Sequence, residues 1–272
     1  MNDFPVAPPL ATQPEPRGLR LERVEIGLLY FLMFAGGLWH IFDVLQAAMS
    51  LLAAPMVILL AFWLAYRYDQ RLRLRGANEA ESYALPAKKL GSIGLGTTTA
   101  RFHWWNILVV AGCYWIEFIG VKTGVIFGEY AYTGVWTPSY KGVPFAIGFA
   151  WLGMLLSSFA CMQAARSGAL SATLFGRSPA LQAAFVAAQM TVFDVFMEPV
   201  AVKLHYWGWA GQSDAAFFVA PLQNYAAWFI IGYALAFLAL RLGLFQRAMP
   251  RVAFHAYWAQ LLYFAMITLG KP

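Results

Sequence analysis

Seven stretches of the chain are long and apolar enough to cross a membrane as helices. A helix rises about 1.5 Å per residue, so about 20 apolar residues span the hydrocarbon core of a bilayer. The expected spans are Val24–Phe42, Leu45–Tyr66, Trp104–Val121, Val143–Ala164, Leu181–Val200, Ala216–Leu240 and Val252–Leu269. The sequence therefore predicts an all-α, polytopic integral membrane bundle with about seven transmembrane helices.

The composition excludes several other classes of protein. Hydrophobic residues make up 61% of the 272 residues and charged residues only 12%, whereas a soluble domain carries roughly a quarter charged residues. Two cysteines, Cys113 and Cys161, are too few for a disulfide-rich secreted scaffold. The net charge of +6 arises from basic residues in the membrane loops, so we expect no nucleic-acid partner.

The basic residues predict the orientation of the chain. With the N-terminus and every second loop on one side, that side holds 15 of the 19 Lys and Arg residues. Basic residues stay cytoplasmic, so the N-terminus is expected inside and the C-terminus outside. Residues 1–20 are rich in proline and lack the apolar centre of a signal peptide. We expect them to form a flexible cytoplasmic tail before one transmembrane domain over 21–272, with a long basic cytoplasmic loop at about 67–103.

Polar side chains within the spans point to a functional site. Placing a charged side chain at the bilayer centre costs about 2.5–3.5 kcal/mol. A charged residue within a span therefore suggests a functional role. Glu117, Asp194 and Asn224 lie in three different spans, and His40 and Asp43 close the outer end of the first. All lie at a similar depth in the outer half of the membrane. For His40 and Asp43 an interfacial hydrogen bond is favoured over a metal site, and no bound metal is expected.

Asp194 and Glu198 are spaced i, i+4, which places both carboxyl groups on one face of a helix. Two neighbouring carboxylates in a dry site cannot both ionise cheaply, so one is expected to hold a proton at neutral pH. A retained proton is what a general acid needs. In the alternative interpretation Glu198 is merely interfacial, beside a helix-ending Pro199, and meets water or Lys203.

Two aromatic segments lie on the outer side. The segment Gly120–Thr133 is rich in glycine, which lets the backbone turn closely, and His205–Trp209 follows the fifth span. Both are compatible with an ordinary interfacial belt of aromatic residues. Alternatively, the two segments together cover the polar cluster from outside.

No cofactor signature was found. His40, His103, His205 and His255 form no HxxxH or HxxH pair, which argues against a di-iron enzyme of the membrane histidine-box kind. The seventh span contains no lysine for a retinal Schiff base. These patterns argue against a histidine-box di-iron enzyme and a retinal protein.

The outer segments and the polar spans resemble the membrane carotenoid-biosynthesis hydratases, a family that includes bacterial γ-carotene and lycopene hydratases and archaeal bisanhydrobacterioruberin hydratase. The matching residues are Glu117-x-x-Gly120-x-Lys122-Thr123-Gly124-x-x-Phe127-Gly128-x-Tyr130-x-Tyr132, Gly142-Val143-Pro144, Trp151, Asp194-x-x-x-Glu198-Pro199, Trp207-x-Trp209, Pro221-Leu222-x-Asn224 and Trp228. The chain departs from the family pattern at two places: His205 stands where a glycine is expected, and Val219-Ala220 replace a Gly-Val or Gly-Ile pair.

The resemblance implies addition of water to the terminal double bond of an acyclic carotenoid ψ-end, without a redox cofactor. Asp194 or Glu117 is then the expected proton donor, and a partner carboxylate, with Glu198 as a further candidate, stabilises the cation and takes a proton from the water. Cation–π contacts from Trp115, Tyr130 and Trp207 add about 0.5–2 kcal/mol each. The residues expected to bind the substrate are Lys122, Tyr130, Tyr132, Trp207, Trp209, Asn224, His40 and Asp43. The expected partners are the carotenoid, water, membrane lipid and other carotenoid-pathway enzymes, and the expected location is the bacterial inner (cell) membrane.

Two alternatives remain open on the sequence. A carotenoid end-group cyclase starts with the same protonation, but a neighbouring double bond captures the cation and the mass stays unchanged. A small-molecule or proton-coupled transporter also uses membrane carboxylates and glycine-rich loops. Against transport, the spans show no inverted repeat, and the polar residues cluster at one depth.

Overall fold

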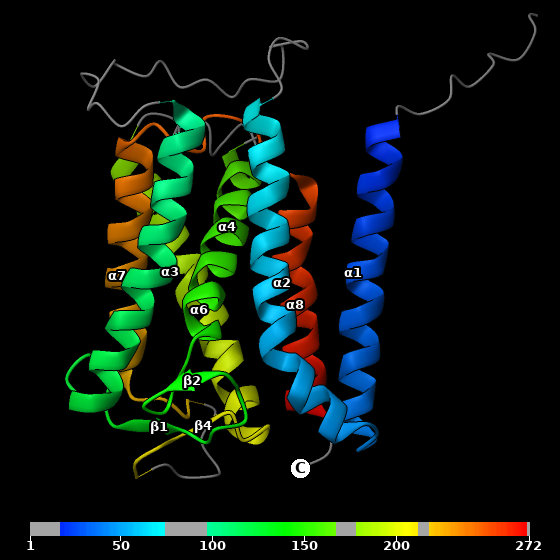
Figure 1. The fold of residues 1–272 in the computed structure, drawn as a ribbon, viewed down its shortest axis with the longest axis vertical. Helices are drawn as coiled ribbons and strands as arrows, with labels where there is room; N and C mark the ends of the chain where they lie inside the picture. The colour runs from blue at the N-terminus through cyan, green and yellow to red at the C-terminus, as the bar shows by residue number, and fades with distance from the viewer. Residues whose placement is uncertain (1–16, 74–96, 167–177, 212–217, 271–272) are drawn as a thin grey trace, which may run out of the picture.

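The computed structural model describes residues 17–73, 97–166, 178–211 and 218–270. Within these residues, seven helices are long and apolar enough to cross a membrane, which confirms the predicted all-α polytopic bundle (Figure 1). They are α1 (Arg17–Ile41), α2 (Gln46–Arg73), α3 (Thr98–Thr123), α4 (Ala146–Arg166), α6 (Pro179–Lys203), α7 (Leu222–Arg241) and α8 (Arg251–Leu269).

Several helix ends differ from the predicted ones. Helix α2 continues to Arg73 and α3 begins at Thr98, so both ends of the segment predicted as a loop over 67–103 are helical. Hydropathy detects only the part of a helix that crosses the hydrocarbon, whereas a helix can continue into the headgroup region. Helix α7 starts at Leu222, not at Ala216, because Pro221 forms its N-cap. The predicted tail is helical from Arg17, and residues 1–16 and 74–96 lie outside the described residues.

Helix α4 forms the centre of the bundle. It packs against α2, α3, α6 and α8, and nearly all of its side chains are buried. A helix that is apolar all round is stable only where neighbouring elements cover it. Helix α1 packs mainly on α8, and α7 on α6 (Figure 1), so both present a large apolar face to the lipid.

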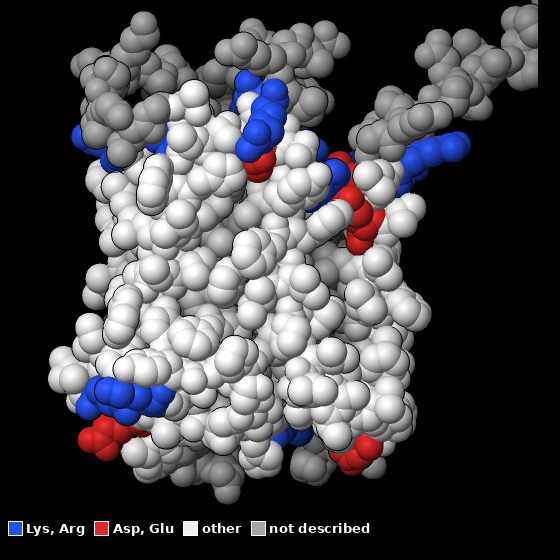
Figure 2. All heavy atoms as spheres, in the orientation of Figure 1, with Lys and Arg blue, Asp and Glu red and all other residues white. Residues whose placement is uncertain are grey.

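Charged residues gather at the two ends of the bundle, and the band between them is almost entirely uncharged in the view of Figure 2. At the end where α1 begins, described basic residues include Arg20, Arg67, Arg71, Arg101 and Arg251. The opposite end carries Lys122, Lys141 and Lys203. The predicted orientation rests on this bias and stays a prediction.

Short strands cross the end of the bundle at which α3 and α6 terminate (Figure 1). Strand β1 (Tyr130–Tyr132) pairs antiparallel with β4 (Trp207–Trp209), and β2 (Ser139–Tyr140) pairs with β3 (Val143–Pro144). Helix α3 is stopped by Gly124, which has a φ of 67°, a left-handed conformation that glycine adopts without strain. The chain then turns back across the bundle towards β1.

Candidate active site

The β1–β4 pair places four aromatic side chains on one face. Tyr130 is paired with Trp209, and Tyr132 with Trp207. Because side chains alternate along a strand, these four share a face, and Ala131 occupies the other. The burial pattern agrees, since Trp207 and Trp209 are buried and the intervening glycine is exposed. The two aromatic segments therefore do cover the polar cluster together.

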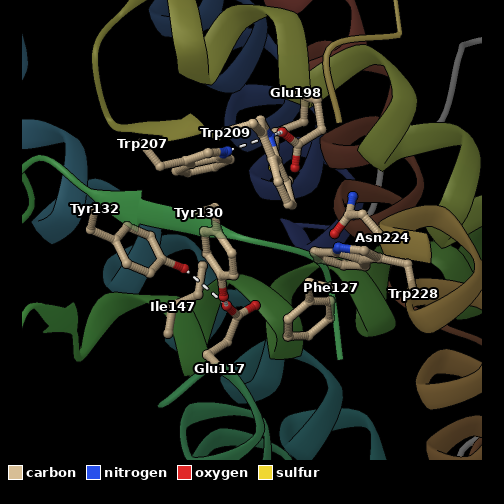
Figure 3. A pocket seen from close by; sticks show the side chains of 11 residues that line it. Glu117, Phe127, Tyr130, Tyr132, Ile147, Glu198, Trp207, Trp209, Asn224 and Trp228 are labelled. Atoms are coloured by element: carbon tan, nitrogen blue, oxygen red, sulfur yellow. Dashed lines mark hydrogen bonds between the residues drawn. The ribbon is translucent and has the colours of Figure 1, made fainter. Parts of the chain in front are cut away.

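Glu117 of α3 is buried and accepts hydrogen bonds on both carboxyl oxygens; Figure 3 shows the tyrosine side. Trp151 Nε1 donates to Oε1 at 2.9 Å. Tyr132 Oη donates to Oε2 at 3.1 Å, and the Tyr130 hydroxyl makes a short bond to the same oxygen. Burial, reinforced by the Glu117 charge, raises the pKa of Tyr130 and Tyr132 well above the usual range. Both phenols therefore stay protonated and remain donors to Glu117.

Glu198 of α6 faces Glu117 from the other side (Figure 3). Trp207 Nε1 and Trp209 Nε1 both donate to its Oε2, at 3.0 and 2.7 Å. The side chain is only 3% exposed, so the interpretation of Glu198 as an interfacial residue is wrong. Pro199 lies within α6 and does not end it, and the ammonium of Lys203 donates to backbone carbonyls of the α8 end.

Asp194 lies one turn before Glu198 and is fully buried. Its Oδ2 accepts a hydrogen bond of 2.7 Å from the Asn224 amide of α7, whereas its Oδ1 is buried and has no hydrogen-bond partner among the described residues. Asp194 and Glu198 are both buried side chains of α6, four residues apart. The predicted placement of the two carboxyls on one helix face is thus confirmed.

A small cavity lies between Glu117 and Glu198. Its volume is about 20 Å³, which is room for about one water molecule. Asp194 does not line the cavity, but it is bonded to Asn224, which does. The lining residues are Glu117, Phe127, Tyr130, Tyr132, Ile147, Met197, Glu198, Trp207, Trp209, Asn224 and Trp228 (Figure 3).

Two tryptophans from apolar spans complete the site. The rings of Trp151 and Trp228 stack with centroids 3.7 Å apart and an interplanar angle of 7°. Trp228 lines the cavity, while Trp151 bonds Glu117. In the sequence, both tryptophans stood out only through the resemblance to the family. Trp228 follows Asn224 by four residues and therefore lies on the same helix face. This spacing could have indicated that Trp228 belongs to the site.

Four residues with predicted roles lie elsewhere. Lys122 is exposed and donates to the backbone oxygen of Lys141 at 3.3 Å. His40 and Asp43 form hydrogen bonds with Gln46 at the end of α1, in line with the favoured interfacial role. Trp115 is 53% exposed. Depth in the membrane, the basis of several of these assignments, does not determine which way a side chain points around its helix axis.

Within the described ranges, no group of three or more His, Cys, Asp or Glu side chains could hold a metal ion. The site therefore offers carboxyl, phenol, indole and amide groups for chemistry.

At the departure from the family pattern, His205 has a φ of 55°, the left-handed conformation that favours glycine. The backbone shape expected of a glycine is thus retained there by histidine.

The chain was also compared with known proteins. A family model described as "Carotenoid biosynthesis protein" matches residues 85–270, which is more than half of the chain and includes every residue of the cavity. No curated protein and no solved structure matches the chain.

Proposed function

The chain belongs to the family of carotenoid biosynthesis proteins, and on that basis we propose that this integral membrane protein is a hydratase that adds water to the terminal double bond of an acyclic carotenoid. The observation that carries the proposal is the cavity between Glu117 and Glu198. It has room for about one water molecule, and carboxyl groups with different hydrogen-bond partners flank it.

The Asp194–Glu198 pair is the proposed source of the proton. Two buried carboxyl groups one helix turn apart hold one proton more cheaply than two negative charges. Glu198 is the member that lines the cavity, so it delivers the proton, and Asp194 behind it shares the proton beforehand. Protonation of the less substituted carbon of the double bond leaves a tertiary carbocation.

Glu117 is the proposed anionic partner. Three donors bond its two oxygens, and such an arrangement favours the carboxylate form. Its negative charge lies across the cavity from the proton source, where it stabilises the positive charge as it develops. A water in the cavity attacks the cation, and Glu117 accepts the proton that the water loses. That proton returns to the Asp194–Glu198 pair, and the net reaction is alkene plus water to tertiary alcohol.

Aromatic faces contribute to the same step. Trp207, Trp228 and Tyr130 line the cavity, and a cation over an aromatic ring gains about 0.5–2 kcal/mol. The Trp207 indole and the Tyr130 phenol already donate to Glu198 and Glu117, so their ring faces are the groups left for the cation.

The test is expression in a bacterium that accumulates lycopene, followed by mass analysis of the extracted pigments. The proposal expects a product heavier by one or two waters with an unchanged polyene absorption. The matched control is Glu198→Gln at the same membrane level, which is expected to leave lycopene unaltered. A product of equal mass with a shortened chromophore would identify a cyclase and overturn the proposal.

A further inference from the structure

A second hollow lies on the outer side of α7, next to the cavity. Its volume is about 300 Å³. Ala226 and Ile230 are exposed on the surface of α7, so the hollow opens towards the lipid. It is lined by Ile126, Gln223, Ala226, Ala227, Ile230 and Ile231, and we call it the α7 groove.

Only a thin wall separates the α7 groove from the cavity. At three places one residue lines the groove and the next residue along the chain lines the cavity. These pairs are Ile126 and Phe127, Gln223 and Asn224, and Ala227 and Trp228. These three pairs form the wall between the two spaces, so the α7 groove adjoins the site at which the carboxyl groups meet.

The lining of the α7 groove suits an apolar chain. Five of its six residues are Ile or Ala. The sixth, Gln223, has its amide engaged, because Nε2 donates to the backbone oxygens of Gly124 and Val125. These bonds tie the loop after α3 to the start of α7. Burial of apolar ligand surface in such a groove is favourable by about 25 cal/mol per Å².

We propose that the α7 groove binds the isoprenoid chain of the substrate just behind its reacting end. This inference rests on the proposed function and names the binding site that serves it. A cavity of about 20 Å³ is too small for an isoprenoid end group, so the end must reach the carboxyl groups from an adjoining space. The α7 groove adjoins the cavity and is open to the bilayer, in which a carotenoid dissolves.

Phe127 is the apolar part of the wall and the side chain that the entering end group displaces. It is almost completely buried and packs against Gly120, where an added Cβ would lie 2.5 Å from its ring. Asn224, by contrast, is held by its bond to Asp194. The displaced group is thus a side chain with packing contacts alone.

The experiment fills the groove without touching the cavity. Ala226→Trp adds bulk at an exposed groove position, and Ala234→Trp makes the same change at an exposed position of α7 outside the groove. Both proteins are produced in lycopene-accumulating cells and purified in detergent. The readouts are the lycopene retained per protein and the rate of hydration. Ala226→Trp is expected to lower both readouts about tenfold, because overpacking of the groove weakens binding by about 1.4 kcal/mol. Ala234→Trp is expected to lower neither readout.

The two readouts separate this inference from the proposed function. Pigment lost in Ala226→Trp alone, with no hydration by the wild type, would support the groove and count against the hydratase. Wild-type pigment and rate in Ala226→Trp would overturn the groove and leave the hydratase standing. Phospholipid released from the wild type in place of lycopene, and missing from Ala226→Trp, would show a lipid site and overturn the inference.

Discussion

Buried or partly buried acidic residues occur at both ends of the bundle, but their partners differ in kind. At the end where α1 begins, the partners are cationic or ionisable: Glu22 bonds Arg71, Glu25 pairs with Arg67, and Asp69 pairs with Arg73 and His103. At the other end, the donors to Glu117 and Glu198 are phenols and indoles, and the donor to Asp194 is an amide.

We propose that this difference separates structural carboxylates from reactive ones. A guanidinium beside a carboxylate fixes the negative charge, so such a pair anchors helices and does not exchange protons readily. Neutral donors hold a carboxyl group in place and still allow a proton to arrive or leave. The arginine-paired Glu22, Glu25 and Asp69 precede the residues that match the family, 85–270, whereas the three carboxyls of the site lie within them.

The largest expected effect is at the proton source. Glu198→Gln and Asp194→Asn keep the shape of each side chain but remove the shared proton. Each is expected to lower hydration about 10²–10⁴-fold, the usual contribution of general acid catalysis. The measurement is the hydrated product formed per membrane-embedded protein. Full activity in both variants would show that neither carboxyl supplies the proton and would remove the functional contrast between the two ends.

The next effect tests the anionic partner. Glu117→Gln replaces a charge by a dipole of the same shape and is expected to lower the rate about 10²-fold, as losses of electrostatic stabilisation commonly do. If the charge acts mainly on the transition state, kcat falls while KM changes little. A rise in KM at unchanged kcat would instead assign Glu117 to substrate binding.

The number of membrane-spanning helices among the described residues was predictable from the sequence. Hydropathy located all seven helices, and the i, i+4 spacing placed Asp194 and Glu198 on one face, because both signals depend on local geometry alone. The resemblance also located Glu117, Tyr130 and Tyr132, which the structure brings into one hydrogen-bonded group.

The pairing of β1 with β4 was not predictable. The two strands have three residues each and lie more than 70 positions apart, so no local periodicity reveals them. The same aromatic residues fit an interfacial belt equally well. The rotation of each helix about its axis was also out of reach. Trp115 and Lys122, which the resemblance assigned to the site, do not line the cavity.

A smaller effect concerns the packing of the site end. Gly120→Ala places a Cβ 2.5 Å from the Phe127 ring and is expected to lower stability by about 1–3 kcal/mol through overpacking. The control is Gly112→Ala on the same helix, whose Cβ meets only Leu108 at 4.0 Å. The comparison is the thermal unfolding midpoint of the two variants in detergent. Equal midpoints would show that Phe127 moves aside freely.

A substitution at the arginine-paired end is expected to change the stability of the protein and not the rate of hydration. Glu22 accepts from Arg71 at 3.2 Å and from the backbone nitrogen of Arg251 at 2.6 Å, and so joins α1, α2 and α8. Glu22→Gln is expected to cost about 1–2 kcal/mol, because a charged hydrogen bond becomes a neutral one. Hydration per folded protein should be unchanged. A loss of activity as large as that of Glu198→Gln would erase the distinction between the two ends.

The smallest effect is expected at Lys122, which shares the site end with Glu117 but not its surroundings. Its ammonium is exposed and bonds the Lys141 backbone oxygen, so Lys122→Gln removes a surface contact worth about 0–1 kcal/mol. Hydration is expected to stay at the wild-type rate in a membrane assay run beside Glu117→Gln. A rate as low as that of Glu117→Gln would mean that a cation five residues from Glu117 acts on the buried carboxylate. In that case the neutral donors alone would not account for the chemistry of this end.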